Sequence, residues 1–383
     1  MSINEVKLGN ISKGGKGTYG IAASTKDAGT SKYTYLRITD ITDDGELNLN
    51  SLASLDDPNA SKYLLAPGDI VFARTGASTG RSYFYDGSIP DMVYAGFLIK
   101  YSLDETKVNP KYIKYYCISK QYKDWISSSL TGSTRGNINE QQLREMPIPV
   151  PERSVQDSVV RILDSITESI KANNRTNDNL YKIGRSIYDH YEATESKRVP
   201  VKKILNFTRG FEPGSASYKE DKNGQTVRFI RVGDMDSLAG STFIDKKIAS
   251  IFAEPNDILI SFDASIGRVA FGVCGAYSTG IRKVYSVKND IPKSFIYYYL
   301  TSKNAQDTIS ENATGTTIKH ASKAIDYMTM PFSEKTSGIY QALDSIFDKQ
   351  LSIKAENERL TKLRDTLLPE LLNGKIDVSN IDI

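Results

Sequence analysis

The second half of the chain repeats the first, because similar short segments follow one another in the same order. The separation between matched residues falls gradually, from 196 positions for Ile11 and Phe207 to 180 positions for Leu163 and Leu343. Small loop deletions produce a gradual decrease of this kind, so we interpret the chain as two similar units. The matched segments are Ile11–Gly14 with Phe207–Gly210, Tyr35–Asp40 with Phe229–Asp234, Pro67–Ile70 with Pro255–Ile258, Gly80–Arg81 with Gly267–Arg268, Thr131–Thr134 with Thr314–Thr317, Met146–Pro147 with Met330–Pro331, and Leu163–Ile166 with Leu343–Ile346.

Each repeat begins with a part in which β-branched and aromatic runs alternate with Gly, Asp and Asn. Runs bounded by such turn residues are typical of short strands. We expect strands at 33–38, 70–73, 229–232 and 269–273, and helices near 112–125 and 293–301. These parts of the sequence predict compact α+β modules.

A helical stripe closes each repeat. Apolar or small residues recur there in steps of three and four, the period of a coiled-coil seam. Pro151 suits a first helical turn, and Asn373-Gly374 is a good helix stop. We expect two long antiparallel helices that pack together. The stripe residues are Val155, Val159, Ile162, Ile166, Ile170, Asn173, Asn177, Leu180, Gly184, Ile187 and Tyr191 in the first helix, and Ile339, Leu343, Ile346, Gln350, Ile353, Asn357, Leu360, Leu363, Leu367 and Leu371 in the second.

Two asparagines, Asn177 and Asn357, fall at matching positions of the two stripes. A polar residue inside a seam costs stability but fixes the register of the helices. We interpret both asparagines as determinants of helix register. The alternative is that both side chains face water, where Asn is usually found.

Length and composition limit the class of protein. The 383 residues exceed a typical single domain of roughly 100 to 200 residues. Since no run of about 18 apolar residues occurs and the first ten residues lack an apolar signal core, we expect neither a membrane span nor export. Cys117 and Cys274 cannot form a Cys-based zinc site, which fits a reducing cytoplasm. The net charge of +3 permits a nucleic-acid partner without indicating one strongly.

Two similar modules joined by stiff helices would form a caliper, in which each module reads one short DNA sequence and the helices set the separation. Geometry fixes half-site spacing in the same way in dimeric DNA-binding proteins. The same layout could grip any elongated partner with two sites. Two other classes therefore stay open: a coiled-coil scaffold that binds protein and no DNA, and a methyltransferase or nuclease that acts alone.

Several motifs resemble those of the specificity subunits of type I restriction-modification systems. The resemblance covers nearly the whole chain, and the order of the motifs, given twice, makes it specific. The motifs are Pro67–Val71 leading to Arg74–Arg81, Thr131–Arg135 with Asn137-Ile138, Met146–Glu152 before the first long helix, and Leu367-Leu368 to Gly374–Ile376.

This resemblance implies two target-recognition domains that read a bipartite, asymmetric site in double-stranded DNA. It also implies that the helices dock two adenine methyltransferase subunits, and that restriction subunits with an ATP-driven motor and nuclease join them in a phage-defence complex. S-adenosylmethionine, ATP and magnesium would then belong to the partners. The chain itself would be non-catalytic and would hold no cofactor and no metal.

The two copies differ where the motifs carry charge. Arg74-Thr75-Gly76 becomes Phe262-Asp263, and Arg135 has no basic counterpart immediately after Thr317. Because direct readout depends on which side chains reach base edges, unlike modules predict unlike half-sites. The candidates for phosphate or guanine contacts, each with a solvated surface charge or a local structural pair as the alternative, are Lys13, Lys16, Arg74, Arg81 and Arg135 in the first domain and Arg209, Arg231, Arg268, Arg282 and Lys319 in the second.

Other motifs do not support an enzyme. Gly15-x-Gly17-x-x-Gly20 matches a dinucleotide fingerprint but lacks a βαβ frame, so we interpret it as a turn-rich loop. Asn109-Pro110 and Ile291-Pro292 are interpreted as helix starts, where Pro is favoured. No phosphate-binding loop of the Gly-x-x-x-x-Gly-Lys type occurs, and the only histidines are His190 and His320.

We therefore predict an α+β protein with a pseudo-two-fold internal repeat, in which two similar target-recognition domains are separated by two long antiparallel coiled-coil helices. The predicted boundaries are 1–148 for the first target-recognition domain, 149–194 for the first spacer helix, 195–331 for the second target-recognition domain, 332–375 for the second spacer helix, and 376–383 for a C-terminal tail.

Overall fold

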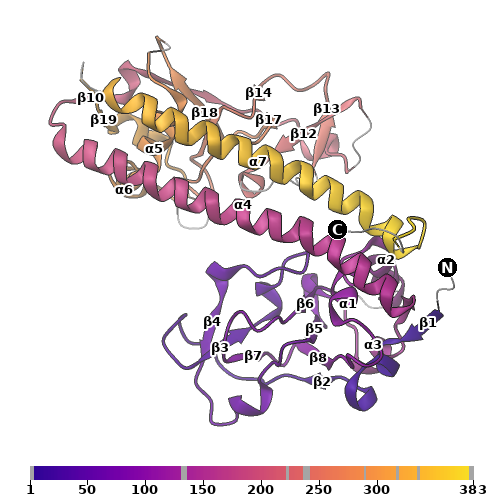
Figure 1. The fold of residues 1–383 in the computed structure, drawn as a ribbon. Helices are drawn as coiled ribbons and strands as arrows, with labels where there is room; N and C mark the ends of the chain where they lie inside the picture. The colour runs from indigo at the N-terminus through magenta and orange to yellow at the C-terminus, as the bar shows by residue number, and fades with distance from the viewer. Residues whose placement is uncertain are drawn as a thin grey trace. The chain divides into compact units, whose positions relative to one another are not determined.

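The computed structural model describes residues 4–130, 136–220, 224–235, 242–288, 290–315, 319–333 and 337–378. The chain forms two compact units: unit 1 comprises Met1–Glu168 and Thr361–Ile383, and unit 2 comprises Ser169–Leu360. Two long helices, α4 (Arg153–Thr194) and α7 (Ser337–Leu372), contribute residues to both units (Figure 1). In the described ranges, no helix is long and apolar enough to cross a membrane.

Unit 1 contains two small sheets and a strand pair. Its β5 segment, Asp-Ile-Val-Phe-Ala, is buried along its whole length, as a β-branched and aromatic run favours. One sheet has the order β2-β8-β5-β6, from β2 (Thr18–Tyr19), β8 (Leu98–Ser102), β5 (Asp69–Ala73) and β6 (Ser82–Phe84). The other has the order β4-β3-β7, from β4 (Ala53–Leu55), β3 (Tyr33–Leu36) and β7 (Met92–Tyr94), and β1 (Asn4–Lys7) pairs with β9 (Pro147–Val150).

The described part of unit 1 also contains three short α-helices, and each begins at a capping side chain. They are α1 (Pro110–Tyr116), α2 (Lys120–Ser129) and α3 (Glu140–Arg144). Asn109 caps α1 by accepting a hydrogen bond from the Lys111 N–H, with Pro110 at the first helical position. The interpretation of Asn109-Pro110 as a helix start is thereby confirmed.

Unit 2 repeats this topology. One sheet has the order β11-β18-β15-β16, from β11 (Leu205–Arg209), β18 (Ile281–Ser286), β15 (Ile258–Ser261) and β16 (Val269–Ala270). The other has the order β13-β12-β17-β14, from β13 (Phe243–Asp245), β12 (Thr226–Ile230), β17 (Gly275–Tyr277) and β14 (Phe252–Ala253). The strand pair is β10 (Arg198–Pro200) with β19 (Thr329–Pro331), and the helices are α5 (Lys293–Leu300) and α6 (Lys303–Glu311).

The two units have equivalent turns as well as equivalent strands. The Gly80 N–H donates to the Ala73 carbonyl over 2.8 Å, and the Gly267 N–H donates to the Ser261 carbonyl over 2.8 Å. A parallel pair joins β3 to β7 in unit 1 and β12 to β17 in unit 2. The predicted α+β class and the internal repeat are therefore confirmed.

One matched pair of the sequence comparison is wrong. The residue of unit 1 that corresponds to Gly210 is Gly20, since their N–H groups donate to equivalent carbonyls, of Ile281 and Leu98. A Cβ at either glycine would lie 2.2 Å from a carbonyl oxygen of the neighbouring segment. Gly14, the partner expected from sequence, has φ +73° in a turn, and nothing lies within 4 Å of its Cβ position. Close backbone approach, not a left-handed turn, therefore explains the repeated glycine.

In unit 1, the beginning of α4 packs against the end of α7. Val159 and Leu163 of α4 share one buried cluster with Leu368 and Leu371 of α7. Val378, which follows α7, is buried in the same cluster.

In unit 2, the end of α4 packs against the beginning of α7. Tyr188 of α4 shares a buried cluster with Leu343 and Phe347 of α7. Residues later in α4 contact residues earlier in α7, so the two helices run in opposite directions here as in unit 1 (Figure 1). The expectation that the two stripes pack together antiparallel is confirmed.

One stripe residue is misplaced in the sequence analysis. Leu363 is 47% exposed, whereas the Arg364 side chain is 15% exposed. Along this part of α7 the half-buried positions include Leu360, Arg364 and Leu367, so the spacing of four and then three is kept with a basic side chain in place of Leu363.

Candidate nucleic-acid interface

The loop that leaves the central strand of the four-stranded sheet has the same backbone frame in both units. In unit 1 the Arg74 N–H donates to the Phe97 carbonyl over 3.0 Å, and the Ile138 N–H donates to the Arg74 carbonyl over 2.9 Å. In unit 2, Phe262 makes the same two bonds, to Gly280 over 2.9 Å and from Ala321 over 2.8 Å. Arg74 and Phe262 therefore occupy one equivalent position.

The next residue in each loop makes an equivalent bridge to a later segment. Thr75 pairs with Asn137 in unit 1, and Asp263 pairs with His320 in unit 2. The deletion of one residue seen in the sequence therefore falls after this bridge, where Gly76 has no equivalent in unit 2.

In unit 1, the Arg74 guanidinium lies over the ring of Tyr19, with its central carbon 5.1 Å from the ring centre. The Arg74 Nε is buried without a hydrogen-bond acceptor. Tyr19 ends strand β2 and is 43% exposed, and its hydroxyl accepts from the Glu140 N–H over 3.3 Å. Phe97, beside Arg74 in the backbone frame, is 58% exposed. This edge of unit 1 thus presents a cation stacked on the ring of Tyr19.

The Gly15-x-Gly17-x-x-Gly20 motif includes Tyr19 and therefore lies at this edge of unit 1. Gly17 packs against Tyr101, and Thr18 and Tyr19 form β2. No helix follows Gly20 directly, so the fingerprint does not open a helix N-terminus that could bind a pyrophosphate.

In unit 2, a cleft of about 650 Å³ brings together three of the predicted basic residues, Arg209, Arg231 and Arg282. Arg209 is exposed, and its Nε donates to the Thr279 carbonyl over 3.3 Å. Arg231 donates to the Asp234 carboxylate over 3.0 Å, and this bond raises the pKa of Arg231. The cleft therefore carries positive charge at its surface.

Arg282 lies deeper in this cleft and is 7% exposed. Its guanidinium donates to the Thr279 carbonyl over 2.5 Å and to the Ser322 hydroxyl over 3.1 Å. Burial lowers the pKa of Arg282, and the nearby charge of Arg209 lowers it further. Arg282 thus joins strand β18 to the segment around Ser322.

The same cleft contains an acid and an imidazole. The His320 Nδ1 lies 2.6 Å from the Asp263 Oδ1, and the His320 side chain is 59% exposed. The equivalent positions in unit 1, Asn137 and Thr75, carry no charge. The two edges therefore differ in chemistry although their backbones match.

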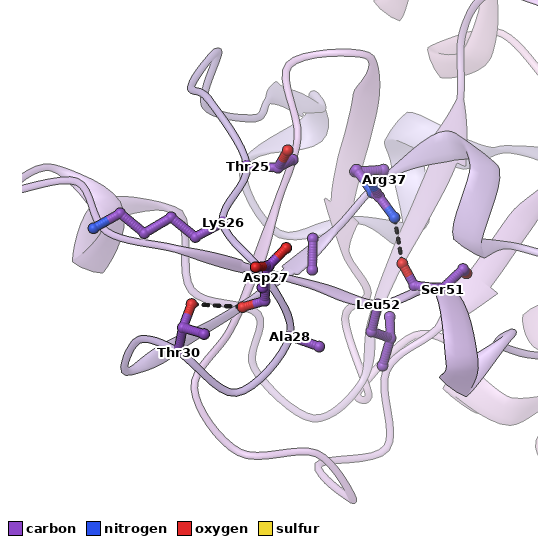
Figure 2. A pocket seen from close by; sticks show the side chains of 9 residues that line it. Thr25, Lys26, Asp27, Ala28, Thr30, Arg37, Ser51 and Leu52 are labelled. Carbon is purple, nitrogen blue, oxygen red and sulfur yellow. Dashed lines mark hydrogen bonds between the residues drawn. The ribbon is translucent and has the colours of Figure 1, made fainter.

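Unit 1 also contains a cleft, of about 550 Å³, which lies beside the three-stranded sheet. Figure 2 shows its lining, with Arg37 facing Ser51 across from the loop at Lys26 and Asp27. Arg37 donates to the Ser51 carbonyl and to Asp40, whose carboxylate raises the pKa of Arg37. Arg37 and Arg231 close equivalent 3₁₀ turns, as their match in sequence predicts.

The remaining predicted basic residues are scattered over the two units. Lys13, Lys16 and Lys319 are exposed. Arg81 donates to Asp43 over 2.7 Å and to the Ile41 carbonyl over 3.0 Å. Arg268 is half-buried, and its backbone N–H donates to the Ser261 hydroxyl. Arg135 lies outside the described residues, and DNA contact by each residue of the set stays a prediction.

The two seam asparagines have different surroundings within unit 2. Asn357 is 8% exposed, donates to Asn174 over 2.8 Å and accepts from Asn173 over 2.9 Å. Asn177 is half-buried, its backbone carbonyl accepts from Gln350, and its side-chain oxygen is buried without a partner. Asn357 therefore does not face water. That the pair fixes helix register stays a prediction.

Sequence reasoning missed several residues of the two edges. Tyr19, Phe97 and Asn137 in unit 1 and Asp263 and His320 in unit 2 were not among the candidate side chains. Aligning Gly20 with Gly210 would have matched Tyr19 with Arg209 and drawn attention to both. Within the described ranges, no cluster of three His, Cys, Asp or Glu side chains could hold a metal.

Comparison with known proteins assigns the chain to a family. A family model described as "Type I restriction modification DNA specificity domain" matches residues 2–182 and 195–362. These two matches cover most of the chain, one in each repeat. The chain belongs to this family of type I restriction-modification specificity subunits, which recognise the DNA target.

Two relatives support the assignment, and one solved structure shares the fold. The chain is 23% identical over 377 residues, covering 90% of its length and 88% of the relative's, to a Methanocaldococcus jannaschii protein assigned as the type I restriction enzyme MjaX specificity subunit. It is 21% identical over 416 residues, covering 84% of its length and 89% of the relative's, to the type I restriction enzyme HindI specificity subunit of Haemophilus influenzae. The crystal structure of a type I system S subunit from M. genitalium has a similar fold, with a TM-score of 0.55 at 17% identity over 97% of this chain and 96% of that one.

Proposed function

We propose that this chain reads a bipartite, asymmetric DNA site, with one half-site bound by each unit, and presents it to two adenine methyltransferase subunits. The lengths of α4 and α7 would set the number of base pairs between the half-sites. The methyltransferase subunits would flip the target adenine out of the duplex to modify it. Restriction subunits join the same core when the system cleaves DNA.

One observation carries this proposal: a shared backbone frame presents different side chains in the two units. Arg74 and Phe262 are held by the same two backbone hydrogen bonds, yet one is a cation and the other a buried aromatic ring. Thr75 and Asn137 are replaced by Asp263 and His320. Because base readout depends on the donors and acceptors presented, such units favour two different half-sites and a non-palindromic target.

We further propose that the chain is not an enzyme. The cleft of unit 2 offers arginines and one His–Asp pair, a set suited to binding DNA through phosphates and base edges. S-adenosylmethionine, ATP and magnesium would bind to the partner subunits. Incubating the purified chain with DNA and S-adenosylmethionine or magnesium should give neither methylation nor cleavage, and activity without partners would refute this part.

The decisive experiment is methylome sequencing of DNA from cells that express this chain with its cognate methyltransferase subunit. We expect one split, non-palindromic motif with adenine modified on both strands. Cells that express the methyltransferase alone are the control and should lack the motif. A continuous or palindromic motif, or the same motif in the control cells, would contradict the proposal.

The competing class is a coiled-coil scaffold that binds proteins and no DNA. Its basis is the long α4 and α7 pair, which could serve protein docking alone. A gel-shift titration of the chain with its methyltransferase subunit separates the two classes. Sequence-selective binding that weakens with salt excludes the scaffold.

A further inference from the structure

Three of the arginines described above already bind a carboxylate. Arg37, Arg81 and Arg231 each donate to an aspartate within their own unit. The aspartate takes Nε and Nη2 of Arg37 and Nε of Arg81 and of Arg231, so each guanidinium already uses in-plane N–H donors that could otherwise bind a base edge. These residues are therefore poorly placed to offer a free fork to DNA.

Arg74 is held differently. Its guanidinium lies on the face of the Tyr19 ring at 5.1 Å, and no acceptor in the part of the chain that the structure describes takes a hydrogen bond from its side chain. A ring contacts the flat face of a guanidinium and leaves the in-plane N–H donors of its terminal Nη1 and Nη2 groups available. This arrangement orients the group without using its hydrogen-bonding capacity.

The equivalent positions of unit 2 exchange the aromatic residue and the cation. Phe262, fully buried, stands where unit 1 has Arg74. Arg209 stands where unit 1 has Tyr19, because it precedes Gly210 and pairs with Arg282 as Tyr19 pairs with Ile99. At these two matched positions each unit therefore keeps one cation, half-buried in unit 1 and exposed in unit 2, but on a different segment of the frame.

We propose that Arg74 determines specificity by reading a guanine of the half-site bound by unit 1, and that Tyr19 is the positioning residue that holds its guanidinium. The fork of an arginine matches the O6 and N7 acceptors of guanine in the major groove. In unit 2, Arg209 makes the corresponding base contact from strand β11. The inference rests on the proposed function, since it assigns residues to a readout that the chain must perform.

The test is methylome sequencing with single variants of the full chain, each expressed with the cognate methyltransferase. Arg74→Ala should broaden base preference at one guanine of one half-site by roughly 5- to 150-fold and leave the other half-site unchanged. Arg74→Lys keeps the charge without the fork and should loosen the same position. Arg209→Ala should loosen one position of the other half-site only.

Variants of Tyr19 test positioning. Tyr19→Leu removes the ring and should loosen the Arg74-dependent position about 2- to 5-fold, whereas Tyr19→Phe keeps the ring and should retain the wild-type motif. Lys32→Ala is the matched control, since the Lys32 Nζ also lies 5.1 Å from a ring centre, that of Tyr33, but away from the shared frame. It should leave the motif unchanged.

The outcomes separate the inference from the proposed function. If the wild-type chain gives no split motif, the proposed function fails. If the wild-type motif is split but Arg74→Ala and Arg74→Lys leave it unaltered, or weaken both halves equally, the inference about Arg74 fails and the proposed function stands. If Tyr19→Leu lowers methylation at every site without changing the motif, Tyr19 supports the fold and does not position Arg74.

Discussion

Tyr115 of α1 donates a hydrogen bond to Asp164 of α4 over 2.6 Å. The same aspartate binds Lys111 over 2.6 Å, so one carboxylate fastens α1 to the long helix. In unit 2 the matched residue, Asp344 of α7, accepts a hydrogen bond from Ser294 of α5 over 2.5 Å. Each long helix is thus fixed to the first short helix of its own repeat by an equivalent aspartate.

This contact gives the first prediction. Tyr115 is almost fully buried. Burial is the largest cause that raises the pKa of its hydroxyl, and the hydrogen bond to Asp164 raises that pKa further. Tyr115→Phe should lower the free energy of unfolding by about 1.5–3 kcal/mol, because a bond to a charged acceptor is lost. Tyr112→Phe, which removes a bond to the neutral Pro149 carbonyl, should cost only about 0.5–1.5 kcal/mol. Urea denaturation measures both, and equal losses would mean that the charge of Asp164 contributes nothing.

A second prediction concerns the repeated glycine. Gly210→Ala would place a Cβ 2.2 Å from the Ser278 carbonyl oxygen and 2.3 Å from that of Tyr277. Since backbone cannot move as easily as a side chain, we expect a loss of about 1–3 kcal/mol or more in thermal or urea unfolding. Gly233→Ala is the control in the same unit, because no atom lies within 4 Å of its Cβ position. Similar stabilities of the two variants would contradict the close approach.

The third prediction concerns the helix seam. Asn357→Ala removes two hydrogen bonds, to Asn173 and Asn174, and should destabilise unit 2 by about 1–2 kcal/mol. Asn177→Ala should cost less, since the Asn177 side-chain oxygen has no partner. Replacing both asparagines with Leu tests register: the variant should gain alternative helix pairings, detected by cysteine cross-linking. A single unchanged register would withdraw the assignment of the pair as register determinants.

Stability should also depend on pH through Asp257. Burial alone would raise the pKa of this carboxyl, but hydrogen bonds from Lys293, the Glu254 N–H and Lys283 lower it below its ordinary value. A group whose pKa is lower in the folded state stabilises above its unfolded pKa, about 3.9, and loses that contribution as pH falls through the folded pKa. Urea denaturation between pH 2.5 and about 6 should therefore show a smaller acid-side loss for Asp257→Asn than for the wild type.

The exposed Asp307, on α6, supplies the control for that measurement. Its ion pair with Lys303 is at the surface and contributes little. Asp307→Asn should keep the acid-side slope of the wild type. If Asp257→Asn and Asp307→Asn have the same slope, the ammonium groups around Asp257 do not contribute to stability.

The fifth prediction separates two arginines of the unit 2 cleft. Arg209 is exposed, so Arg209→Ala should weaken binding of the cognate DNA by the complex with the methyltransferase by roughly 5- to 150-fold, because a base contact is lost, and should leave stability unchanged. Arg282→Ala removes a buried guanidinium that donates hydrogen bonds to two backbone carbonyls and to the Ser322 hydroxyl, and should instead lower stability. Titrations with cognate DNA and melting curves of both variants, with the exposed Lys303→Ala as control, check this. If Arg209→Ala lowered stability and Arg282→Ala weakened only DNA binding, the roles assigned to the two arginines would be reversed.

Sequence alone predicted the architecture because its signals are long. The helical stripes continue over many turns, and each matched segment of the repeat adds to the others, so errors at single residues do not matter. Leu363 illustrates such an error: a step of three fits the pattern, but the helix turns that residue outward and buries most of the Arg364 side chain instead.

The site was less predictable because its chemistry depends on residues distant in sequence. Arg81 donates a hydrogen bond to Asp43, which lies 38 positions earlier in the sequence, and no local pattern reveals this pair. Arg282 is buried because strand β18 turns it toward Ser322. Tyr19 acquires a role only when the sheet brings it under Arg74.

The division of the chain into units has a consequence for biosynthesis. Unit 2 is a single stretch, Ser169–Leu360, whereas unit 1 combines Met1–Glu168 with Thr361–Ile383. Leu368, Leu371 and Val378 fill the same buried cluster as Leu8 near the amino end. On the ribosome, all of unit 2 is therefore translated before the last part of the unit 1 core emerges, so the half that starts first is completed last.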